Sequence, residues 1–129
     1  MKLFAMAMLV FAFYSTASQA GVTSFTVTSA TLSKSTGTIA VTGTIACTAG
    51  DLFSIVTNIV QVSGGHNGET IGLPIMGTCS GGVDTWVAPQ TLRFGSIKNG
   101  NAQVVTEAID LTDGSIVQEV FHQPVTPVP

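Results

Sequence analysis

The sequence predicts an all-β domain, folded as a two-sheet β-sandwich of about seven strands. Apolar and polar side chains alternate over residues 38–47, which is typical of a strand with one buried face. Turn-forming residues recur about every eight to twelve positions, the spacing expected of short sandwich strands. After residue 20 no stretch keeps a helical period, so the prediction contains no helix.

Residues 1–20 have the layout of a secretory signal peptide. A positively charged start precedes an uncharged apolar run over residues 3–14, and small Ser18 and Ala20 stand where a signal peptidase cuts. A retained signal anchor is the alternative. The apolar run is shorter than the roughly 20 residues that span a bilayer, which favours cleavage after Ala20.

Cleavage at this point would leave one domain over residues 21–123 and a Pro-rich tail over residues 124–129. We expect the product to be secreted, either into a periplasm or outside the cell, without membrane attachment after cleavage. The prolines of the tail predict a polyproline-like segment that leaves the sheet.

The first half of the domain contains the clearest strands. A Thr- and Val-rich strand is expected over residues 22–32, followed by a turn over residues 34–37. The next strand spans residues 38–47. Its apolar face carries Ile39, Val41, Gly43, Ile45 and Cys47. Residues 52–62 are β-branched and apolar on both faces, which predicts a central strand covered on both sides.

The second half is interrupted more often by Gly and Pro. Residues 63–68 are expected to form a flexible loop, and Pro74 indicates an edge strand or a bulge. The Asn-Gly sequence within residues 98–101 favours a tight hairpin. Further strands are expected over residues 69–79, 83–94, 102–111 and 115–122, the last two as a hairpin.

Cys47 and Cys79 are the only cysteines, and both lie in the predicted mature domain. In an oxidising compartment we expect them to form a disulfide. A metal pair or a catalytic thiol is the alternative, and the sequence offers few partners for either.

Several segments resemble a family of small secreted bacterial immunoglobulin-like domains of unknown function. The resemblance rests on Thr-Gly-Thr-Ile-Ala-Cys at residues 42–47, Thr-Cys-Ser-Gly-Gly at 78–82, Trp86, and the Asn-Gly-Asn-Ala-Gln-Val entry to a late strand, and it spans about residues 36–111. It implies an immunoglobulin-like fold, a disulfide and secretion, and it carries no catalytic residues. Trp86 follows Cys79, whereas antibody domains place the tryptophan between the two cysteines.

Charge excludes one class of partner. Once Lys2 is removed, seven acidic residues face three basic ones, a net charge of −4. Nothing is left to follow a phosphate backbone, so we expect no nucleic-acid binding.

Candidate ligand residues are few. His66, Asn67 and Glu69 lie in or beside the predicted Gly-rich loop and could contact a ligand, although a solvated loop is the simpler interpretation. His122 is interpreted as an edge residue of the last strand, and Trp86 as a core residue. Residues 110–114 offer oxygens to calcium but lack the acid spacing and terminal Glu of strong sites. We therefore predict no catalytic residues, no metal site and no cofactor.

The function expected from these features is that of a secreted, non-catalytic binding or accessory module for an unknown protein or surface partner, as a monomer or with weak self-association. A structural or adhesion-type subunit that self-associates by strand addition is the first alternative. A small secreted enzyme is the second.

Overall fold

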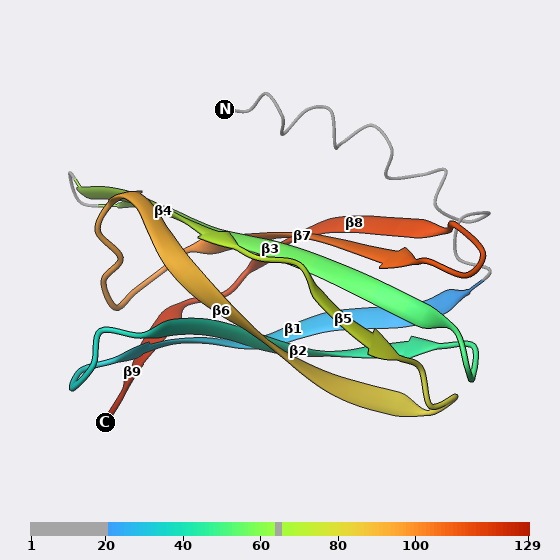
Figure 1. The fold of residues 1–129 in the computed structure, drawn as a ribbon. Coiled ribbons are helices and arrows are strands. Elements are labelled where there is room, and N and C mark those ends of the chain that lie inside the picture. The colour runs from blue at the N-terminus through green and yellow to red at the C-terminus, as the bar shows by residue number, and fades with distance from the viewer. Residues whose placement is uncertain (1–20, 64–65) are drawn as a thin grey trace.

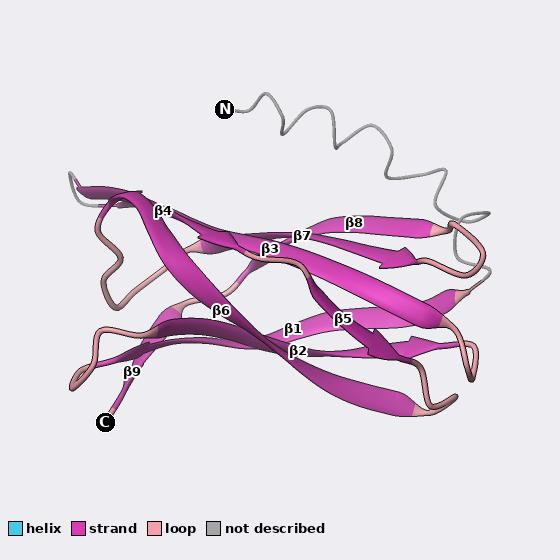
Figure 2. Cartoon of the chain, viewed as in Figure 1, coloured by secondary structure: helices cyan, strands magenta, loops and turns pink. Residues whose placement is uncertain are grey.

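A computed structural model describes residues 21–63 and 66–129, so the predicted signal peptide lies outside the described residues. The strands are β1 (Val22–Ser33), β2 (Ile39–Cys47), β3 (Leu52–Ser63), β4 (His66–Gly72), β5 (Ile75–Thr78), β6 (Val83–Gly95), β7 (Gln103–Asp110), β8 (Ile116–His122) and β9 (Val125–Val128). Figure 2 shows loops joining these strands and no helix in the described ranges. Those ranges accordingly contain no helix able to cross a membrane. The all-β prediction is confirmed.

All nine strands belong to one hydrogen-bonded sheet in the order β8-β7-β3-β4-β6-β2-β1-β9, with β5 paired to β3. Figure 1 shows that this sheet folds over, with β1, β2 and β9 in one layer and β3, β4, β7 and β8 in another. Strand β6 crosses between the layers: it pairs with β2 up to Gln90 and with β4 from Gln90 to Gly95. The core lies between the two layers.

The alternation predicted for β2 is confirmed. Its odd-numbered residues from Ile39 to Cys47 are buried, and the residues between them are half-buried. Gly43 is the one position on this inward face without a side chain. Trp86 lies opposite it on β6 and stacks on Phe25, with ring centroids 5.5 Å apart. A β-carbon on Gly43 would overlap the Thr26 carbonyl oxygen and lie 2.8 Å from Cε2 of Trp86. The glycine therefore makes room for the indole, and the prediction of Trp86 as a core residue is confirmed.

Strand β3 is central, as predicted, but the prediction that it is covered on both sides is wrong, because Leu52 and Val62 on its second face are exposed. It pairs with β7 along one side and with β5 and β4 at the two ends of the other side. Between those two partners a backbone N–H of β3, that of Ile59, is bonded by a side chain instead. The buried Thr70 hydroxyl accepts from the N–H of Ile59 (2.9 Å) and donates to Gln90 (2.6 Å), and the amide of Gln90 donates to Thr57 (2.6 Å). A buried polar network of this kind removes the cost of unpaired groups at the gap.

The disulfide between Cys47 and Cys79 is present, with Cα atoms 5.5 Å apart. It joins the end of β2 to the residue that follows β5, and thereby links the two layers. Both cysteines are buried. The prediction of an inward-facing Cys47 with a single partner is confirmed.

Two predicted turns are wrong. Residues 63–68 are not a loop throughout, because β4 already begins at His66, opposite Ser63. Residues 98–101 do not close a hairpin, since β6 and β7 are not neighbours in the sheet. The side-chain amide of Gln61 holds this connection by accepting from the Lys98 N–H (2.8 Å) and donating to the Lys98 carbonyl (2.7 Å). An Asn-Gly pair shapes the local backbone, but it does not choose which strands meet.

The expectation that the tail leaves the sheet is also wrong. Strand β9 pairs in parallel with β1 over Ala30–Ser33. The Val125 N–H donates to the Gly100 carbonyl (2.8 Å) on the side of β9 opposite β1. Pro127, two residues later, has its nitrogen on that same side, so its missing N–H costs no bond to β1. Together with the division of residues 69–79 into β4 and β5, this strand raises the count from seven to nine.

Candidate functional site

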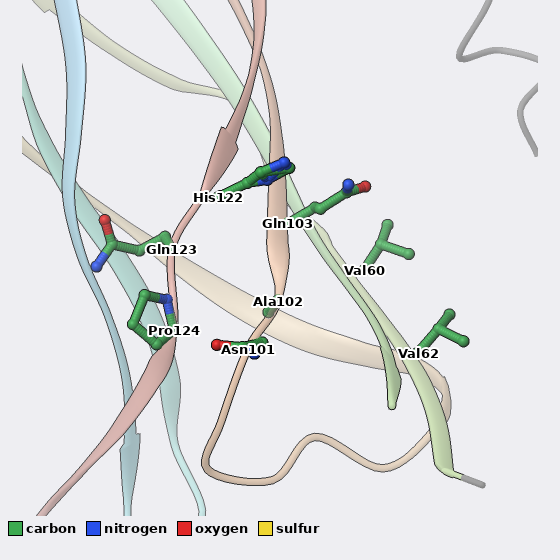
Figure 3. Close-up of a pocket in the computed structure, with 8 residues that line it drawn as sticks. All are labelled: Val60, Val62, Asn101, Ala102, Gln103, His122, Gln123 and Pro124. Atoms are coloured by element: carbon green, nitrogen blue, oxygen red, sulfur yellow. The ribbon is translucent and has the colours of Figure 1, made fainter. Parts of the chain in front are cut away.

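A hollow of about 600 Å³ lies at the end of the layer that contains β3, β7 and β8. Its lining residues are Val60, Val62, Asn101, Ala102, Gln103, His122, Gln123 and Pro124 (Figure 3). They come from the end of β3, the β6–β7 connection, the start of β7, the end of β8 and the β8–β9 connection. Residues about sixty positions apart in the sequence therefore meet at one place.

The register of the strands explains this meeting. Val60 lies opposite Gln103, and Gln103 lies opposite His122. Directly paired residues share a face with β-carbons about 5 Å apart. The sequence neighbours Ile59 and Val104 are fully buried, so the row Val60–Gln103–His122 faces outward. Figure 3 shows these three side chains extending to the same side.

The ligand residues predicted from sequence lie beside this row. Asn67 is opposite Val62 and Glu69 is opposite Val60, which places both next to the hollow. Glu69 also forms an ion pair with Arg93, at 3.6 Å between carboxylate oxygen and guanidinium nitrogen. His66 is the first residue of β4, and its side chain lies outside the described part of the structure. The structure thus brings Asn67 and Glu69 together on one face.

Sequence reasoning missed Gln103 and Gln123, and it interpreted His122 only as an edge residue. His122 does end β8, a strand at the edge of the sheet. An amide side chain in a strand carries no local sign that it faces a hollow. Only the pairing of β3 with β7 and of β7 with β8 makes neighbours of these residues.

The lining offers both hydrogen-bonding groups and apolar surface. Amide and imidazole groups donate and accept hydrogen bonds, while Val60, Val62 and Pro124 add apolar surface. The lining contains no hydroxyl, thiol or carboxylate side chain.

A second cluster lies at the opposite end of the sheet. Carboxylate oxygens of Asp51, Asp110 and Asp113 all lie within 4.8 Å of one another. Asp51 is in the β2–β3 turn, Asp110 ends β7, and Asp113 is in the β7–β8 turn. Oxygens at this spacing could surround a calcium ion, which binds its oxygen ligands at about 2.3–2.6 Å. The sequence pointed to residues 110–114 but could not place Asp51 beside them.

Asp110 is the centre of this cluster and is fully buried. Its Oδ1 accepts from the N–H groups of Thr112 (2.9 Å) and Asp113 (3.1 Å). With Asp51 ionised, the Oδ2 atom of Asp110 has no hydrogen-bond partner among the described residues. When Asp51 is protonated it donates to the Asp110 carboxyl, and this hydrogen bond, loss of solvent, and the charges of Asp110 and Asp113 raise the pKa of Asp51 to about 6. Hydrogen bonds from the backbone and hydroxyl of Ser115 lower the pKa of Asp113.

Comparison with known proteins assigns no function to the hollow or to the acidic cluster. No family model matches the chain, and no curated protein matches it.

Proposed function

We propose that this protein is a secreted, non-catalytic module with an immunoglobulin-like two-sheet sandwich fold, which binds a protein or surface partner through the hollow. The observation that carries the proposal is the lining itself, because it combines hydrogen-bonding amide and imidazole groups with apolar surface and lacks hydroxyl, thiol and carboxylate side chains. Binding sites combine apolar surface with a few placed polar groups in this way.

Exposed apolar side chains beside the hollow support the same function. Val62 is 75% exposed, and Phe94, opposite Glu69 on β6, is 51% exposed. A row of paired residues therefore runs across five strands, from Phe94 through Glu69, Val60 and Gln103 to His122. Contiguous apolar surface with a polar rim is typical of a contact site for another molecule.

The proposals of export and of a sandwich fold are supported by observations other than the hollow. The disulfide favours an oxidising compartment outside the cytoplasm. The two layers joined by β6, with the core between them, are compatible with a two-sheet sandwich. The signal-like start of the chain and the resemblance of residues 36–111 to secreted immunoglobulin-like domains agree with both.

A binding experiment tests the hollow directly. The chain starting at Gly21 would be labelled and incubated with intact cells of the organism that makes it, beside the double variant Gln103→Ala, His122→Ala. Thr44→Ala, on the outward face of the other layer, is the matched control. We expect the double variant to lose most cell-associated label and the control to keep it. Equal retention by all three would reject the hollow as the contact site.

Catalysis can be tested in parallel. The mature protein should show no turnover in a broad screen of hydrolase substrates, with and without calcium and zinc. Activity that disappears in the double variant His66→Ala, Glu69→Ala would contradict the non-catalytic proposal and make the start of β4 an active site.

The alternative of a self-associating subunit is favoured by one specific feature. Among the described strands, β5, β8 and β9 each pair along one side only, and β9 carries Pro127 with its nitrogen on the free side. Proline at an edge blocks strand addition, whereas β5 and β8 contain none. Strand addition would therefore use β5 or β8. Sedimentation over a range of concentrations separates the two functions: a discrete monomer supports the binding module, and open-ended assembly supports the subunit.

A further inference from the structure

Gly21, the residue that cleavage after Ala20 would make the N-terminus, lies against the acidic cluster. A β-carbon built on it would overlap Asp110 Oδ2 and lie 2.6 Å from Asp113 Oδ2. Its carbonyl accepts from the Thr48 N–H (3.1 Å), which holds the residue at the β2–β3 turn. The backbone nitrogen and a β-carbon are bonded to the same atom and lie about 2.5 Å apart. The nitrogen of Gly21 is thus within about 5 Å of both carboxylate oxygens.

The cluster needs a positive partner. A buried carboxylate oxygen without a donor is costly, and Asp110 Oδ2 is such an atom. The three basic side chains of the predicted mature chain lie elsewhere in the fold. Lys34 follows the far end of β1, Arg93 pairs with Glu69, and Lys98 belongs to the β6–β7 connection. The one further positive charge that the mature chain would gain is its own α-ammonium group.

We propose that the α-ammonium group of Gly21, created by signal cleavage, is the ligand of the Asp51–Asp110–Asp113 cluster and donates a hydrogen bond to Asp110 Oδ2. This inference rests on the export and cleavage that form part of the proposed function. Before cleavage the nitrogen is a neutral amide with a single N–H. After cleavage it carries a positive charge and three donors, which suits a site with three carboxylates.

The consequence is that processing stabilises the fold. In the uncleaved chain Asp110 Oδ2 has no partner among the described residues, whereas in the cleaved chain the α-ammonium group would bind the carboxylates of the β2–β3 and β7–β8 turns. The positive charge that balances the three carboxylates would then come from signal cleavage and not from a metal ion. This end of the sheet lies beside the disulfide. Asp51 is connected to that disulfide through its carbonyl, which accepts from the Cys79 N–H (2.8 Å).

The experiment compares two purified chains, one starting at Gly21 and one starting at Ser18, each with and without Asp110→Asn. Melting temperatures would be measured in EDTA and in calcium chloride. We expect the Gly21 chain to melt about 5 °C or more above the Ser18 chain in EDTA, and Asp110→Asn to abolish that difference. Glu107→Gln is the matched control, because Glu107 is an outward residue of β7 bonded to Gln118 (2.9 Å), and it should preserve the difference.

A second measurement does not depend on the variants folding. In the Gly21 chain, NMR titration of the α-amino group should give a pKa at least about one unit above its ordinary value near 8. Equal melting temperatures of the two chains together with an unshifted α-amino pKa would overturn the proposal. Equal stabilisation of both chains by calcium would overturn it too and would assign the cluster to the metal. Both chains are made with a defined first residue, and only stability and a pKa are measured. The results therefore depend neither on signal cleavage in the cell nor on binding through the hollow.

Discussion

Replacement of Gly43 by alanine tests whether the core is built around the missing side chain on β2. The added methyl group would overlap the carbonyl oxygen of Thr26 and meet the indole of Trp86. The first contact is with backbone, so no rotamer change relieves it, and β1 must move away from β2. We expect a loss of about 3 kcal/mol in the free energy of unfolding, at the upper end of the range for overpacking.

Gly82→Ala is the matched control, because its β-carbon would meet only the hydroxyl of Ser80, at 3.8 Å. Urea denaturation followed by tryptophan fluorescence is a clean assay, since Trp86 is the one tryptophan in the chain. The melting temperature of Gly43→Ala should fall by roughly 12–24 °C. A variant that stays within about 1 kcal/mol of Gly82→Ala would refute the packing explanation. Trp86→Leu in the same chain should not rescue it, because the clash with Thr26 remains.

Three further predictions follow from the fold. The double variant Cys47→Ala, Cys79→Ala should lose about 3.7 kcal/mol in urea denaturation, the loop-closure value for a sequence separation of 32, and two free thiols in the native unreduced protein would contradict the pairing. Val41→Asp should prevent folding by placing a charge on the inward face of β2, whereas Thr42→Asp should cost about 1 kcal/mol, and equal damage from both would contradict the assigned faces. The raised pKa of Asp51 means that the folded uncleaved chain holds a proton that the unfolded chain releases, so stability should fall as the pH rises from 3.8 to about 6. Asp51→Asn should flatten that slope in melting experiments, and an unchanged slope would show that another group titrates there.

Prediction from sequence succeeded where the signal is local. The alternation over residues 38–47 located β2 and its inward face, and the two-sided apolar run over residues 52–62 indicated a central strand. The hairpin of β7 and β8 was also predicted, since its turn lies between adjacent strands. In each case a period of two or a short turn contains the information.

The candidate sites could be predicted only in part. Asn67 and Glu69 were singled out from sequence, but Gln103 and His122 became their neighbours through two strand pairings. Asp110 was noted as an oxygen donor, whereas the approach of Asp51 required β3 to pair with β7. Side-chain type suggests what a residue can do, and register decides what it meets.

The amino-acid sequence by itself determined the strand class, the buried face of β2 and the cysteine pair, because each depends on residue type and local spacing. Tertiary structure alone decided the crossing of β6 between layers, the fit of Trp86 over Gly43 and the docking of the tail. The tail shows the physical reason. Polyproline and β-strand backbones both lie in the extended region of backbone dihedral angles, so residues 125–128 are extended in either case, and only the free edge of β1 makes them a strand.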